Sequence, residues 1–347
     1  MNEHAAPPPA PTVGFLPDKK EFAKIYFVNL FLNILTLTLY SPWAKIRERK
    51  YLYGHLTING QSFGYHADPW VLFRGRLLIL AFVALYLFGG YFWMYLPGVV
   101  FLLFLAAMPW LIVRSLRFNM ANTSFANRRF AFDGTVKGAF AAYLLWPLLG
   151  LLTLGLMYPY AVFKQKRFLF GNRRFANHPF VFGGSAKPVF VIFFKALLLG
   201  LLLAGIGFFI LMVSGSLMSS IKAEKSFFVF VFLAVLYLAM IALGMIVAAF
   251  VRVRLLNYVL NHLRLDTLGF AGRLGVEDLL LIYLKNLALI VLTLGIYLPW
   301  AKLNLMGYYA GHVELNGELP LGEAAAQDAS NAVGDEANDI LDMDIAF

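Results

Sequence analysis

Long apolar runs dominate the chain and alternate with short polar segments. Four runs are candidates for membrane helices: Leu77–Met94, Val99–Val113, Val189–Val213 and Phe227–Val251. A helix needs about 20 apolar residues to cross the hydrocarbon core of a bilayer, with a range of about 17–25. Three of the runs meet this length, and the second is slightly shorter. The pattern therefore predicts a polytopic α-helical membrane protein.

Three further apolar segments carry a repeated sequence that ends in a Pro-aromatic-Ala element. Residues 25–60 and 282–317 are identical at 18 of 36 positions, and a weaker copy includes Thr153–Ala161. We call them TLG segments, after the Thr-Leu-Gly tripeptide of the last two copies. Internal repeats indicate a fold that is built from similar units. With the polar residues that follow them, the repeats span 22–66, 139–186 and 278–321.

Short segments with strand-like alternation follow the helices. Two of them contain Asn-Gly, at Asn59-Gly60 and Asn316-Gly317, which is a strong signal for a two-residue hairpin turn. Related segments lie at 114–134, 173–184 and 254–272. A single hairpin is marginally stable in water, so pairing of the five into one small sheet is a hypothesis. We predict an all-α polytopic membrane protein with internal pseudo-repeats and a small cytoplasmic-side β-hairpin layer.

The charges indicate how the chain is threaded. Strongly basic segments at 114–137 and 164–187 would lie on opposite sides of the membrane if every apolar run crossed it once. Cytoplasmic loops are normally the basic ones. We therefore predict four full spans, in the helical hairpins 77–113 and 189–251, plus three re-entrant or kinked TLG segments. Seven plain spans are the alternative. The basic loops and both termini are predicted to be cytoplasmic.

The two ends of the chain differ from the predicted membrane domain, 22–321. Residues 1–21 begin with an Ala/Pro-rich stretch without the features of a signal peptide, and we expect a disordered tail. Residues 322–347 are acidic without a basic residue and are also expected to be disordered, with docking onto a protein partner as the alternative. The net charge of +10 comes from basic residues beside apolar runs, so we expect the lipid bilayer, and not nucleic acid, as partner.

Polar side chains inside apolar segments are the first candidates for a functional site, because they are costly in a membrane. They form a candidate polar path that comprises Asn29, Asn33, Thr36, Lys285, Asn286 and Thr293. The first three are spaced i, i+4 and i+7, so they share one helix face. The alternative is hydrogen bonding between helices for the Asn and Thr residues, and snorkelling to the interface for Lys285.

Two matched Tyr-x-x-x-His pairs follow the first and third TLG segments. Tyr51 and His55 form one candidate surface pair, and Tyr308 and His312 form the other. Histidine can shuttle protons or bind metal. Neither pair has a neighbouring carboxylate or second ligand in the sequence, and the middle copy has Phe168 and Asn172 instead. We interpret these residues as helix caps.

The Pro-Trp-Ala-Lys elements supply four candidate interfacial anchors. They are Trp43, Lys45, Trp300 and Lys302. Tryptophan favours the headgroup region of a bilayer, and lysine interacts with anionic lipid headgroups. Recognition of a specific headgroup by the basic patch Lys45, Arg47, Arg49 and Lys50 is the functional alternative.

The chain lacks cysteine, a Gly-rich phosphate loop, an HExxH motif and a G-x-S-x-G motif. We expect a protein that is not an enzyme and has no cofactor and no metal. The T-L-G-x-Y-x-P-W-A-K element, the Y-x-x-G-H that follows it and the N-x-R-R-F-x-F-x-G segment resemble the YjgN family of bacterial inner-membrane proteins. The resemblance covers about residues 14–321 and implies an inner-membrane location, but no reaction.

Two function classes remain. The first is a transporter or channel-like protein for a small solute or lipid, because repeats with Gly/Pro-interrupted membrane segments often mark transport sites. The second is a non-catalytic membrane scaffold or envelope-assembly factor that recruits a partner through the acidic tail. The sequence does not determine the substrate, the coupling ion or the oligomeric state.

Overall fold

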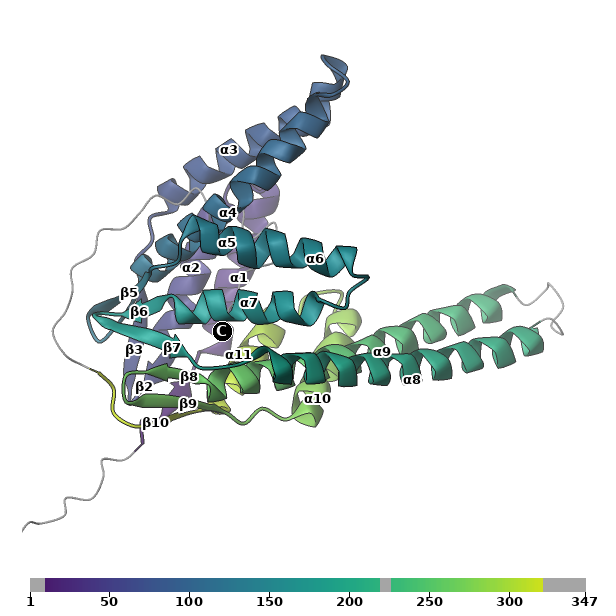
Figure 1. Cartoon of the computed structure of the whole chain (residues 1–347). Helices are drawn as coiled ribbons and strands as arrows, with labels where there is room; N and C mark the ends of the chain where they lie inside the picture. The colour runs from purple at the N-terminus through teal and green to yellow at the C-terminus, as the bar shows by residue number, and fades with distance from the viewer. Residues whose placement is uncertain (1–9, 219–225, 321–347) are drawn as a thin grey trace, which may run out of the picture.

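The computed structural model describes residues 10–218 and 226–320 (Figure 1). The strands are β1 (Val13–Phe15), β2 (Leu56–Ile58), β3 (Gln61–Tyr65), β4 (Thr123–Phe125), β5 (Arg128–Phe132), β6 (Arg173–Phe175), β7 (His178–Phe182), β8 (Leu263–Leu265), β9 (Leu268–Gly272) and β10 (Val313–Asn316). The α-helices are α1 (Lys19–Leu35), α2 (Ser41–Gly54), α3 (Pro69–Phe88), α4 (Leu96–Asn122), α5 (Val136–Phe140), α6 (Trp146–Leu152), α7 (Tyr158–Gly171), α8 (Ala186–Met218), α9 (Ser226–Asn261), α10 (Val276–Leu292) and α11 (Leu298–Gly311). A 3₁₀ turn, η1 (Gly89–Tyr91), follows α3, and a π-helical turn, η2 (Ala141–Leu145), joins α5 to α6.

The same order of elements occurs five times: a strand, a helical hairpin and a second strand. We number these units 1 to 5 in chain order. Unit 1 begins with β1 and ends with β2, and unit 5 begins with β9 and ends with β10. The first helix of each unit contacts the second helix of the preceding unit, in the pairs α2–α3, α4–α5, α7–α8 and α9–α10. Helix α11 of unit 5 makes the same kind of contact with α1 of unit 1. The five units therefore form a ring.

The ten strands pair in chain order as one antiparallel sheet. Phe63 of β3 is opposite Phe125 of β4, for example, and Phe180 of β7 is opposite Leu265 of β8. The first and last strands also contact each other, so the sheet is nearly closed. All the helical hairpins project from one side of it (Figure 1).

This sheet shows that the predicted fold class is wrong. The fold is not all-α with a small hairpin layer, because ten paired strands form a nearly closed sheet. The alternative of seven plain spans fails as well, since the strands before and after every helical segment belong to the same sheet. Val13–Phe15 pairs with Leu56–Ile58, although we predicted a disordered tail over 1–21. The acidic tail, 322–347, lies outside the described residues.

Apolar side chains from the whole sheet fill its interior. The buried members are Phe125, Phe175, Leu265, Leu268 and Leu315, and the partly buried members include Val13, Ile58, Phe63, Phe130 and Phe180. Every one of the ten strands thus contributes to a single cluster. The interior of the sheet is consequently an apolar core and not an aqueous channel.

Tight turns join one unit to the next. Asn59 and Gly60 have φ angles of 51° and 77°, which is the left-handed pair that a two-residue hairpin of type I′ requires. Ala126 and Asn127 take φ angles of 49° and 59° in the next turn, where the sequence has no Asn-Gly. The strands of neighbouring units are therefore held in register by turns of similar shape.

Each TLG segment is a complete helix–turn–helix, and not a kinked single helix. The threonine that ends the first helix accepts a hydrogen bond from the backbone N–H four residues later, at 3.0–3.1 Å for Thr36, Thr153 and Thr293. Gly155 and Gly295 both have φ 92°, which is a region that favours glycine. The Thr and Gly of the repeat thus reverse the chain.

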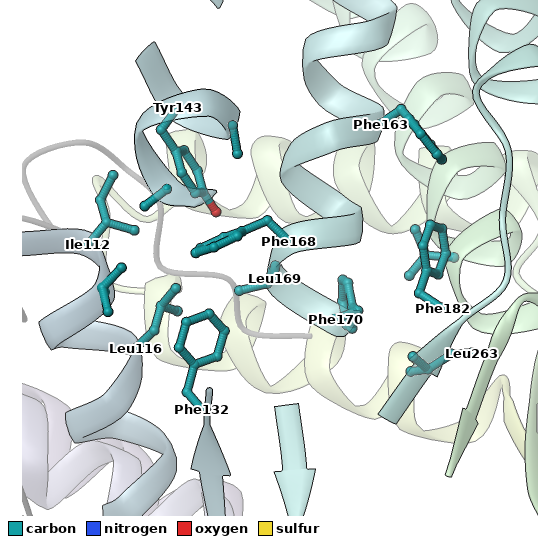
Figure 2. Close-up of a cluster of buried hydrophobic side chains, with 14 of the residues drawn as sticks. Ile112, Leu116, Phe132, Tyr143, Phe163, Phe168, Leu169, Phe170, Phe182 and Leu263 are labelled. Atoms are coloured by element: carbon teal, nitrogen blue, oxygen red, sulfur yellow. The ribbon is translucent and has the colours of Figure 1, made fainter. Parts of the chain in front are cut away.

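The largest buried cluster lies where units 2, 3 and 4 meet, just above the sheet (Figure 2). Phe168 of α7 points toward Tyr143 of η2 and Phe132 of β5, with ring centroids 6.0 and 5.5 Å away. Ile112 and Leu116 of α4 close the same cluster from the neighbouring unit. These aromatic contacts fix the helices of unit 3 on the sheet.

Four helical segments are long and apolar enough to cross a membrane. They are Pro69–Tyr91, Leu96–Asn122, Ala186–Ile210 and Val235–Asn261. They pair as the hairpins of units 2 and 4, which extend farthest from the sheet and diverge (Figure 1). The helices begin earlier or end later than the apolar runs of the sequence, because their inner ends pack on the sheet.

Candidate functional site

The structure places Asn29 and Asn286 at equivalent positions in units 1 and 5. Both are buried, with relative exposures of 6% and 5%. Asn29 Nδ2 donates a hydrogen bond to the Ala44 carbonyl at 3.2 Å, and Asn286 Nδ2 donates to the Ala301 carbonyl at 3.3 Å. Each asparagine thus joins the two helices of its own hairpin. The transport hypothesis predicted a polar cavity that both residues reach, and these contacts within each hairpin remove that support for it.

The remaining members of the candidate path lie in units 1 and 5. A shallow pocket of about 340 Å³ in unit 5 is lined by Ile282, Lys285, Asn286, Asn304 and Tyr308. Lys285 is exposed there. Thr36 and Thr293 form the TLG turns described above. Asn33 is in unit 1, and its buried Oδ1 has no hydrogen-bond partner among the described residues.

The second helix of every unit ends at a histidine or asparagine that bonds to the carbonyl four residues earlier. The distances are 2.8 Å for His55, 2.9 Å for Asn122, 2.6 Å for Asn172, 2.8 Å for His262 and 2.7 Å for His312. Because a carbonyl only accepts, Nδ1 of each histidine carries the proton. The side chains therefore satisfy carbonyls at the C-terminal ends of the helices.

The tyrosines of the candidate surface pairs connect the two ends of each hairpin. The Tyr51 hydroxyl donates to the Asp18 carbonyl at 2.8 Å, and the Tyr308 hydroxyl donates to the Gly275 carbonyl at 2.8 Å. The Tyr308 hydroxyl also accepts from the Gly275 N–H at 2.8 Å. These contacts hold the start of the first helix against the end of the second.

We expect Tyr308→Phe to lower the free energy of unfolding by about 1–3 kcal/mol, because the Gly275 N–H loses its partner and the Gly275 carbonyl keeps only its bond from the Leu279 N–H. Thermal unfolding of the purified protein in detergent measures this change. Tyr91→Phe is the matched control, since Tyr91 is 87% exposed. Equal stability of the two variants would contradict the proposed role of Tyr308.

The tryptophans of the candidate anchors lie at contacts between units. Trp43 packs against Trp70 and Phe73 of unit 2, at centroid distances of 5.1 and 5.3 Å. Trp300 packs against Phe27 of unit 1 at 6.2 Å. Of the two lysines, Lys302 is exposed and donates a hydrogen bond to Glu48 at 2.7 Å, whereas Lys45 is half-buried.

Three cations of units 3 and 4 interact electrostatically. Lys166 of α7 lies close enough to Arg173 and Arg252 for both charges to lower its pKa. Arg173 in turn interacts electrostatically with Tyr53 of unit 1 and with Tyr143. We call Lys166, Arg173 and Arg252 the cation cluster. Its members occur in the sequence as three of many basic residues near helix ends, so only the fold shows that they meet.

No three His, Asp or Glu side chains in the described ranges are grouped so that they could hold a metal ion. The chain has no cysteine that could do so.

Curated relatives of the chain are inner-membrane proteins. An inner membrane protein YjgN of Salmonella typhimurium (strain LT2) is 32% identical over 149 residues, which are 41% of this chain and 36% of the relative. The protein of the same name from Escherichia coli K12 is 31% identical over 135 residues, 39% of this chain and 34% of the relative. The matched part of the chain thus spans about a third of these relatives. No solved structure gives a significant match.

A family model matches residues 10–340, which is nearly the whole chain. It therefore covers all five units of the ring, whereas the matches to the individual relatives cover less than half of the chain. The resemblance to the YjgN family that the repeated motifs indicated is confirmed. The chain belongs to the family described as bacterial proteins of unknown function (DUF898).

Proposed function

We propose that the protein is a multi-pass membrane transporter for a small polar solute or lipid, with the substrate bound inside the ring of hairpins. One observation supports this best: charged and polar side chains of different units meet inside the ring. Arg173 interacts electrostatically with Tyr53, yet units 3 and 1 are not neighbours in the ring. This interaction therefore acts between units that do not adjoin.

Other polar contacts also join helices of different units. Arg49 of α2 donates to Asn119 of α4 at 2.7 Å and to the Tyr65 hydroxyl at 3.1 Å. Arg252 of α9 donates to the Tyr309 hydroxyl of α11 at 2.7 Å. Guanidinium groups carry a planar fork of donors that binds anionic oxygens. These arginines therefore support a binding site for a polar group.

The sheet supports a carrier more than an open channel. Apolar side chains from all ten strands fill its interior. A straight path along the axis of the ring would have to pass through this core. Substrate would thus enter and leave between the hairpins, and those of units 2 and 4 diverge (Figure 1).

The proposed placement in the membrane follows from the long hairpins. The hairpins of units 2 and 4 cross the inner membrane, while the sheet and the basic helix ends face the cytoplasm, as the positive-inside rule favours. Both termini are then cytoplasmic as well. The basic helix ends meet anionic lipid headgroups, and no enzymatic activity is part of the proposal.

A flux experiment tests the transport proposal. The full-length protein is reconstituted into liposomes, which are then assayed for release of entrapped inorganic phosphate and for exchange of a fluorescent phosphatidylglycerol between the leaflets. We expect at least one of the two rates to exceed that of protein-free liposomes. Arg173→Gln should reduce that rate by ~10-fold or more, because a charged hydrogen-bond donor is lost.

Arg167→Gln is the matched control for this experiment. Arg167 is exposed on the same helix as Lys166 and next to it in sequence, so the variant should keep the wild-type rate. If both rates equal those of protein-free liposomes, transport of these probes is excluded. A co-purifying protein that is lost when 322–347 are deleted would then favour the scaffold function.

A further inference from the structure

The cation cluster concentrates positive charge without an acidic partner. No Asp or Glu within the described ranges forms an ion pair with Lys166, Arg173 or Arg252, although such pairs occur elsewhere, for example Lys302–Glu48. Arg173 Nε is buried and has no hydrogen-bond partner among the described residues. The cluster is therefore not a structural salt-bridge network.

The environment of the cluster raises the free energy of its charged state. Burial, together with the guanidinium groups of Arg252 and Arg173, lowers the pKa of the Lys166 ammonium to about 8. Burial also lowers the pKa of the Arg173 guanidinium to about 10. Both groups still carry their charge at pH 7. Like charges that are partly removed from water destabilise the folded protein unless an opposite charge compensates them.

The three side chains come from different elements that the fold brings together. Lys166 is on α7 of unit 3, Arg173 begins β6, and Arg252 is near the end of α9 in unit 4. The Arg173 guanidinium lies over the Phe170 ring at 4.6 Å, and Arg252 is oriented by its hydrogen bond to Tyr309. Packing and hydrogen bonding thus preset both guanidinium groups, which reduces the entropy lost on binding.

We infer that the cation cluster is a binding site for a phosphate group, either free or as the headgroup of an anionic lipid. Two guanidinium groups and an ammonium match the charge of a phosphate, and arginine binds its oxygens in pairs through a planar fork of donors. Tyr53 and Tyr143 interact electrostatically with Arg173, and their hydroxyls would be further donors to phosphate oxygens. This inference rests on the proposed function, because the phosphate group would define the class of substrate that is carried.

The exposure of the cluster fits such a ligand. Arg252 is exposed, whereas Lys166 and Arg173 are only partly accessible. The ligand would meet Arg252 first and the more buried cations afterwards. A headgroup would reach the cluster from the bilayer between the hairpins, and a free phosphate would reach it from water.

Ligand-dependent thermal stability of the full-length protein in an uncharged detergent tests the site. Three probes distinguish a free phosphate from a lipid headgroup: inorganic phosphate, short-chain phosphatidylglycerol, and phosphatidylcholine of the same chain length. A ligand that binds only the folded state raises the melting temperature with its concentration. We expect inorganic phosphate, phosphatidylglycerol or both to stabilise the protein at concentrations where phosphatidylcholine does not. Phosphate acting alone identifies a free anion, and phosphatidylglycerol acting alone identifies a lipid headgroup.

Lys166→Gln and Arg173→Gln should each weaken this binding by ~10-fold or more, and Arg167→Gln should not. Without ligand, Lys166→Gln should be as stable as wild type or more stable, because it removes a charge that is repelled by its neighbours. A purely structural lysine would show the opposite change. The Lys166 variant also provides the test if Arg173→Gln fails to fold.

The inference is overturned if neither phosphate nor phosphatidylglycerol stabilises the protein more than phosphatidylcholine does. It is equally overturned if Lys166→Gln binds as tightly as Arg167→Gln. Binding is measured here without any flux, so its outcome is separate from that of the transport experiment. Binding without flux would reject transport alone, and flux without binding would reject the phosphate site alone.

Discussion

Replacing Phe168 by alanine lowers the free energy of unfolding by about 3–5 kcal/mol, which is the usual range for removing a buried phenylalanine. Phe168 contacts Phe132 and Tyr143 in the cluster shown in Figure 2. A Cβ atom built on Gly134 or on Gly138 would lie within 2.8 Å of its ring. The ring thus fills the space that both glycines leave open, and neither can close the cavity left by its removal.

Thermal unfolding in detergent measures this effect. The matched control is Phe194→Ala, because Phe194 lies on α8 and is 61% exposed. Truncation there removes little protein contact, so the expected change is below about 1 kcal/mol. Similar melting temperatures for the two variants would show that the contacts of Phe168 do not stabilise unit 3.

Leu303→Asp is expected to open the contact between units 5 and 1 at a cost of about 3–5 kcal/mol, as for other buried charges without a partner. Leu303 of α11 is 3% exposed and packs against Phe22, Ile25 and Leu52 of unit 1. No turn connects these two units, in contrast to the other four junctions. Side-chain packing, the Lys302–Glu48 ion pair and the contact between the outer strands must therefore hold the ring closed.

Limited proteolysis with trypsin reports this opening directly. Lys19 and Lys20 begin α1, and cleavage there should become faster in Leu303→Asp than in wild type. Leu16→Asp is the control, since Leu16 lies close to the same junction but is 86% exposed. Wild-type cleavage rates in Leu303→Asp would show that this cluster does not keep the ring closed.

The parts of the fold that depend on local sequence were predictable. The apolar run Leu77–Met94 indicated a long helix, which begins earlier, at Pro69, where the Asp68 carboxylate accepts a hydrogen bond from the Trp70 N–H. The Asn59-Gly60 turn has the left-handed φ angles that its sequence indicated. Helices and tight turns are determined by residues that are close in sequence, so the local sequence is sufficient to predict both.

Closure of the sheet was not predictable in this way. Strand β1 has three residues and follows an Ala/Pro-rich stretch, so no alternation is visible there. The strand that β1 contacts across the gap in the sheet is β10, which lies near the opposite end of the sequence. Pairing at such separation is decided by the packing of whole units, which a pattern of hydrophobic positions does not specify.

The candidate site was likewise predictable only in part. Asn29 and Asn286 were selected because polar residues are unusual in apolar helices, but each bonds to a carbonyl of its own hairpin. Lys166, Arg173 and Arg252 were read only as determinants of topology. Their proximity depends on the order of units in the ring, and no spacing in the sequence expresses that order.

The position of the two outer strands also has a consequence for synthesis in the cell. Strand β1 emerges from the ribosome early, while β10 follows roughly 300 residues later, or about 15–60 s at ~5–20 residues per second. Until then one edge of β1 has unpaired backbone groups, and such edges are prone to wrong pairing. A nascent chain must therefore be protected for most of its translation, until β10 is available to contact β1.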